Sequence, residues 1–142
     1  MSRTIKVMIG SVLLAMTSLV LRTSGQTPAG QKSPIERAVV TFDDKTLVSG
    51  AVLQGKYLVI HDEQKMARGE PCFAIYQASD GTVEPTGKPV VTFYCQTAGR
   101  TLAKDVVMTY AATDTPGVFE LREIQFAGSS IGHRLVSEPR KK

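Results

Sequence analysis

The strongest constraint on the fold is a series of short runs rich in Val, Ile, Phe, Tyr and Thr, separated by clusters of Gly, Pro and Asp. β-Branched and aromatic residues favour strands, whereas Gly and Pro set the backbone angles of turns. The runs predict strands at 37–42, 45–48, 57–62, 72–77, 90–96, 105–113, 118–126 and 131–136, with a single helical turn at 63–68. We therefore expect an all-β domain, either an antiparallel β-sandwich or a small, partly open barrel of about seven to eight strands.

One run carries an irregular pattern. Phe119 and Leu121 share one face of the seventh run. Ile124 and Phe126 share the opposite face, so the alternation of side chains slips by one residue near Arg122. Such a slip predicts either a β-bulge or a strand that passes from one sheet to another.

Residues 1–25 predict a secretory signal peptide. Arg3 and Lys6 precede a mostly apolar stretch of 15 residues at 7–21, and small or polar residues follow it. As a helix, this stretch would extend about 22 Å, less than the roughly 30 Å hydrocarbon core of a membrane. We therefore expect no permanent membrane anchor, cleavage near Gly25, and an exported protein that is periplasmic or extracellular.

The rest of the chain divides into three parts. Residues 26–34 contain two Pro and one Gly and no large apolar side chain, which predicts a linker. Residues 35–137 form the expected β domain, and residues 138–142 form a basic C-terminal tail. Without residues 1–25 the chain has 14 basic and 13 acidic groups, a net charge of +1. This balance argues against a nucleic-acid partner.

Cys72 and Cys95 are the only cysteines in the sequence. An exported chain meets an oxidising environment, so we expect a disulfide between them. Pairing the runs 72–77 and 90–96 as a hairpin puts Cys72 opposite Cys95. The 22 residues between them match neither the Cys-x-x-Cys motif of a disulfide oxidoreductase nor a zinc knuckle.

The candidates for a metal site are His61, Glu63 and His133. His61 and Glu63 point to the same face of a strand because they are two residues apart. If His133 lies beside them, two imidazoles and one carboxylate form a set that holds a transition metal. The alternative interpretation, which we favour at this point, is that these are polar residues at a strand end that contact solvent or a carboxylate.

Two methionines suggest copper, because Met66 and Met108 would add thioether sulfur to the sulfur of Cys72 and Cys95. The spacing of these residues matches no known copper arrangement. We therefore favour core packing for both methionines and expect no cofactor.

Residue types that serve nucleophilic catalysis occur in Ser129, Ser130 and His133, with Asp105 or Asp114 as a third group. No Gly-x-Ser-x-Gly elbow surrounds the serines, and Gly-Ser-Ser is a common loop composition. Because the sequence contains no catalytic motif, we expect a protein that is not an enzyme.

The segment from Val52 to Ile60 resembles an element of small exported bacterial β-domains in which a turn glycine leads into a strand. The segments 69–72, 93–95 and 126–133 are similar to those of a family of uncharacterised exported bacterial proteins of this length. The resemblance covers about residues 38–136. It implies a one-domain β fold with a disulfide, and it implies no activity.

These observations favour a non-enzymatic binding or interaction module in the cell envelope or outside the cell. Its partner would be an unknown protein or glycan, and the loops 62–71 and 78–89 are the surfaces where we expect contact. The alternative function is metal binding through His61, Glu63 and His133. The oligomeric state stays open.

Overall fold

The computed structural model describes residues 33–139. The predicted signal peptide, most of the predicted linker and the last three residues of the basic tail lie outside the described residues. Seven strands and one short helix make up the described part: β1 Ile35–Val48, β2 Ala51–Asp62, α1 Glu63–Ala67, β3 Phe73–Gln77, β4 Val91–Gly99, β5 Val107–Ala112, β6 Val118–Gln125 and β7 Ile131–Val136. The expected all-β class is thereby confirmed.

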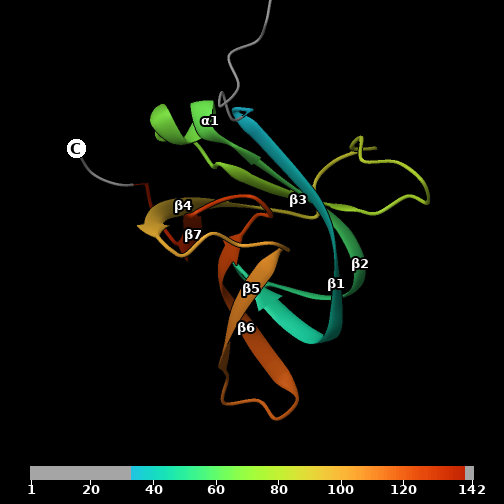
Figure 1. Ribbon diagram of the computed structural model, residues 1–142. Helices are drawn as coiled ribbons and strands as arrows, with labels where there is room; N and C mark the ends of the chain where they lie inside the picture. The colour runs from blue at the N-terminus through green and yellow to red at the C-terminus, as the bar shows by residue number, and fades with distance from the viewer. Residues whose placement is uncertain (1–32, 140–142) are drawn as a thin grey trace, which may run out of the picture. The chain divides into compact units, whose positions relative to one another are not determined.

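Six of the strands close into a barrel in the order β1, β2, β3, β4, β7, β6, and β5 extends the sheet beyond β6 (Figure 1). All neighbours pair antiparallel except β1 and β6, whose parallel pairing completes the ring. The expected antiparallel sandwich is therefore wrong. The expected small barrel is confirmed, but it is closed rather than partly open, because the parallel pairing leaves no opening between β1 and β6.

A bend in β1 makes the closure possible. The sequence runs 37–42 and 45–48 form a single strand whose register against β2 shifts between Phe42 and Thr46. Only the part after this irregularity, Lys45 to Leu47, pairs with β6. A bulge bends a strand and increases its twist, so the Asp43-Asp44 step directs the second half of β1 toward β6.

The barrel interior is filled by apolar side chains from all the closing strands. The largest fully buried ones in this core are Phe42, Phe73, Ile75, Leu121 and Ile124. The predicted slip in the seventh run is confirmed as a bulge, since Thr109 pairs with Glu123 but the next residue, Tyr110, pairs with Leu121. Arg122 is the extra residue, and it allows both Leu121 and Ile124 to be buried.

The disulfide between Cys72 and Cys95 is confirmed, but the expected register is off by one residue. Phe73 pairs with Phe93, so Cys72 precedes the strand rather than facing Cys95 within the ladder. Cys72 joins β3 to the end of β2 instead, because its carbonyl accepts a 2.8 Å hydrogen bond from the N–H of Asp62. Within residues 33–139, no helix is long and apolar enough to cross a membrane.

Candidate metal site

Two histidines meet inside the barrel. His61 lies near the end of β2 and His133 in β7, strands that are not neighbours in the ring. Their ring centroids are 3.9 Å apart, so the contact crosses the barrel interior. His61 is 1% exposed and His133 is 3% exposed, and the sequence contains only these two histidines. The fold therefore buries both of its imidazoles in one place.

A single carboxylate contacts both rings. Glu36 lies in β1 directly opposite His61 in the β1–β2 ladder, and cross-strand partners share a face. Its Oε2 lies 3.3 Å from His61 Nδ1 and 3.2 Å from His133 Nε2. The contact with His133 Nε2 has hydrogen-bond geometry, whereas His61 Nδ1 lies at ion-pair distance from the same oxygen without forming a hydrogen bond.

Three of the four ring nitrogens of the pair lack a partner. His61 Nδ1, His61 Nε2 and His133 Nδ1 are buried and have no hydrogen-bond partner among the described residues. An unsatisfied buried polar atom costs roughly 1–3 kcal/mol, so native proteins rarely keep one without a reason. An unprotonated imidazole nitrogen without a hydrogen-bond partner is the kind of donor atom that a metal ion requires.

Aromatic rings enclose the histidine pair. The ring of Phe73 lies 4.8 Å from that of His61, and the ring of Phe126 lies 6.1 Å from that of His133. Burial in this apolar shell lowers the pKa of His61, the Glu36 carboxylate opposes the shift, and the charge of His133 adds to it. His61 is therefore neutral at neutral pH, which is the protonation state of a metal ligand.

Sulfur completes the cluster on the side of β4. One ligand atom from each of His61, Cys95 and His133 lies within 4.8 Å of the other two, and all three residues are buried. Two ligands at about 2.3 Å from one ion are at most about 4.6 Å apart, so the cluster is close to the span that one ion bridges. In the structure Cys95 is bonded to Cys72.

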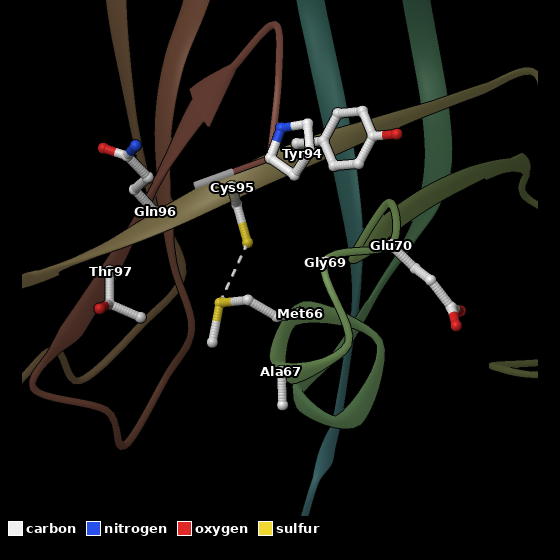
Figure 2. Close-up of a pocket in the computed structure, with 9 residues that line it drawn as sticks. Met66, Ala67, Gly69, Glu70, Tyr94, Cys95, Gln96 and Thr97 are labelled. Atoms are coloured by element: carbon white, nitrogen blue, oxygen red, sulfur yellow. Dashed lines mark hydrogen bonds between the residues drawn. The ribbon is translucent and has the colours of Figure 1, made fainter. Parts of the chain in front are cut away.

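A second sulfur lies on the solvent side of Cys95. Met66, in α1, has its Sδ 3.6 Å from Cys95 Sγ, and Figure 2 shows the two side chains pointing toward each other. Both residues line a cavity of about 210 Å³ between α1 and β4. Asp62 caps α1 by accepting hydrogen bonds from the N–H groups of Gln64 and Lys65, which fixes the turn that carries Met66.

The structure thus brings together two of the three predicted ligands, His61 and His133. Glu63, the third, is exposed at the first position of α1, and Glu36 supplies the carboxylate at the histidines instead. Sequence reasoning missed Glu36 because it is 97 residues from His133. Glu36 also precedes the predicted run 37–42, and only the extension of β1 to Ile35 places it opposite His61.

The structure also locates the two methionines and the residues considered for nucleophilic catalysis. Met66 and Met108 both pack against the core cluster, as expected, although Met66 also reaches Cys95. The Ser129 hydroxyl accepts a 3.1 Å hydrogen bond from the N–H of Ile131, which stabilises the turn before β7. His133 contacts Glu36 and His61 rather than completing a set with Asp105 or Asp114, which are both exposed.

In comparisons with known proteins, no family model, no curated protein and no solved structure matches this chain. The arrangement of its own side chains is therefore the basis for an assignment of function.

Proposed function

We propose that this protein is an exported, non-enzymatic β-domain that binds one transition-metal ion inside its barrel, with His61 and His133 as ligands. One observation carries the proposal. The two imidazole rings meet in the core with their centroids 3.9 Å apart and their planes tilted by 40°, and His61 Nε2 and His133 Nδ1 are among the ring nitrogens that have no hydrogen-bond partner among the described residues. A metal ion satisfies both nitrogens at once, whereas ordinary core packing leaves them unsatisfied.

The surroundings of the pair support the same proposal. Metal-binding histidines usually donate their second N–H to a carboxylate, which orients the ring and makes the free nitrogen more basic. Glu36 makes that contact with both rings. Its negative charge also offsets part of the charge that a buried cation introduces.

Binding rather than catalysis is the role we propose, because both imidazoles are enclosed by the barrel and its phenylalanines. The disulfide is consistent with an exported protein, since such bonds persist in oxidising compartments. A protein or glycan partner at the loops 62–71 and 78–89 stays a prediction.

The test is native mass spectrometry of full-length protein expressed in an exporting host and purified without a polyhistidine tag. The oxidised and the dithiol-reduced forms are each titrated with Zn²⁺ and with Cu⁺. We expect one ion per chain in at least one of these forms, and loss of that ion in His61→Gln and in His133→Gln. The same spectrum reports whether cleavage occurs near Gly25.

A readout without substitutions covers the case in which a variant fails to fold. The sequence has only two histidines, so the imidazole region of an NMR spectrum contains two ring systems. Metal binding should move the resonances of both rings. If no form of the wild-type protein retains an ion, or if the folded glutamine variants retain it equally, the proposal is wrong.

A further inference from the structure

The sulfur atoms of Met66, Cys95 and Cys72 lie next to one another, and Cys95 is the one that belongs to the histidine cluster. Met66 Sδ lines the surface cavity beside α1, Cys95 Sγ lies 3.6 Å behind it, and Cys72 is bonded to Cys95. Cys95 also belongs to the cluster of ligand atoms that lie within 4.8 Å of one another. In the disulfide Cys95 is a poor donor to a metal, whereas as a thiolate it is one of the strongest.

We infer that opening the Cys72–Cys95 disulfide converts the site into a copper(I) site, in which the Cys95 thiolate and the Met66 thioether join the imidazoles of His61 and His133. This inference rests on the proposed function and adds the metal, the remaining ligands and a redox condition. The donor set is two imidazoles, a thiolate and a thioether. This combination of soft sulfur with imidazole is one that copper prefers.

The choice of copper over zinc follows from Met66. Zinc in proteins takes thiolate, imidazole and carboxylate ligands, whereas thioether sulfur is a ligand for copper(I). If the reduced site bound zinc, Cys72, Cys95 and the two histidines would suffice and Met66 would only pack. The methionine is held on a capped turn with its sulfur directed at Cys95 (Figure 2).

The redox step needs a reductant, and we name a dithiol as its class. One thiolate of the dithiol attacks Cys95 Sγ through the cavity, a mixed disulfide forms, and the Cys72 thiolate leaves and takes up a proton. The second thiolate of the reductant then attacks its own mixed-disulfide sulfur, which releases Cys95. The protein gains two electrons and two protons, and the dithiol becomes a disulfide. Binding of Cu⁺ then displaces the proton of Cys95.

The cavity supplies the route for both reactants. Cys95 and Met66 both line the cavity, whereas Cys72 is 2% exposed and does not line it. Attack at Cys95 rather than Cys72 is therefore expected. The same opening admits Cu⁺, which meets the thioether of Met66 first and the buried ligands next.

The experiment measures the Cu⁺ affinity of the full chain under anaerobic conditions, by competition with a chromogenic copper(I) chelator, before and after reduction by a dithiol that is then removed. We expect reduction to raise the affinity by more than the roughly 100-fold that an outer-shell partner of a metal site contributes. The Cys72→Ser/Cys95→Ser double variant should show no change on reduction. Since the chain has no other cysteine, this variant isolates the pair.

Met66→Leu tests the thioether. We expect Cu⁺ binding by the reduced protein to weaken by roughly 10-fold, at the low end of the loss seen when a partner of a metal site is removed. Zn²⁺ binding by the same variant should stay unchanged. Met108→Leu is the matched control, because Met108 also packs on the core but lies in β5, where Tyr110 contacts its sulfur.

The outcomes separate this inference from the proposed function. If reduction and Met66→Leu both leave Cu⁺ affinity unchanged while the histidine variants abolish binding, the inference is wrong and the histidine site stands. If Met66→Leu weakens Zn²⁺ and Cu⁺ equally, Met66 acts through the fold and is no ligand. If the histidine variants bind as the wild type does, both fail.

Discussion

A single residue, Glu36, contacts both imidazole rings and orients them. It contacts His61 Nδ1 and His133 Nε2 through one oxygen, and its side chain is 11% exposed. A carboxylate behind a metal-binding histidine orients the ring and makes its other nitrogen more basic. Without Glu36, both rings would lose this orienting contact.

We therefore predict that Glu36→Gln weakens metal binding by roughly 10–100-fold, the usual loss when a carboxylate behind a metal-binding histidine is removed. Glutamine keeps the size of the side chain but loses the charge. Glu63→Gln is the control, because Glu63 is exposed on α1. Dissociation constants for Zn²⁺ and Cu⁺ measure both variants. A greater loss in Glu63→Gln would restore the ligand set predicted from the sequence.

At the scale of the strands, β7 passes its neighbours closely at Gly132. A Cβ at this position would collide with the Glu123 carboxylate. That carboxylate is held by Arg100, whose Nε lies 2.7 Å from Oε1 and whose terminal nitrogen lies 2.6 Å from Oε2. Arg134 adds a third contact of 3.2 Å, so the side chain of Glu123 cannot turn away without losing its partners.

We predict that Gly132→Ala lowers the free energy of unfolding by about 1–3 kcal/mol, the usual cost of overpacking. Gly99→Ala is the matched control on the adjacent strand, since its Cβ meets nothing within 4 Å and alanine is more favourable than glycine in a strand. Urea unfolding of both variants measures the difference. In a Glu123→Ala background the loss from Gly132→Ala should shrink, and an undiminished loss would place the collision elsewhere.

Local sequence patterns predict the strands well and their arrangement poorly. Turn residues and alternation are local properties, so the runs match β3 to β7 closely and the bulge at Arg122 is found, although the run 57–62 covers only the second half of β2. Barrel closure depends on a parallel pairing between Lys45 to Leu47 and β6, some 70 residues away in the chain, for which no local pattern exists.

The candidate site shows the same limit. His61 and His133 were identifiable by residue type, because the chain has no other histidine. Their contact depends on β2 and β7 facing each other across a closed barrel, and the role of Glu36 depends on the β1–β2 register. Neither arrangement follows from alternation alone. For that reason the sequence pattern points to Glu63, an exposed carboxylate two residues after His61, as the third ligand.

For the whole molecule, the disulfide and the metal would be alternative cross-links that both start from Cys95 in β4. The bond joins the segment before β3 to β4 across a sequence separation of 23 residues. In the chain-entropy treatment, closing such a loop contributes about 3 kcal/mol. A metal ion held by Cys95, His61 and His133 would connect β4, β2 and β7 and so restrain the barrel after the disulfide opens.

We therefore predict that reduction alone lowers the unfolding temperature by roughly 10–20 °C, since about 1 kcal/mol shifts a domain of this size by roughly 4–8 °C. Free Cu⁺ at 100 times its dissociation constant should return about 2.7 kcal/mol to the reduced protein. Circular dichroism during heating, under anaerobic conditions, measures the oxidised, reduced and copper-loaded forms. In the Cys72→Ser/Cys95→Ser variant the same copper concentration should restore much less, because the thiolate is absent. Equal recovery in that variant would mean that copper stabilises the barrel without its cysteines.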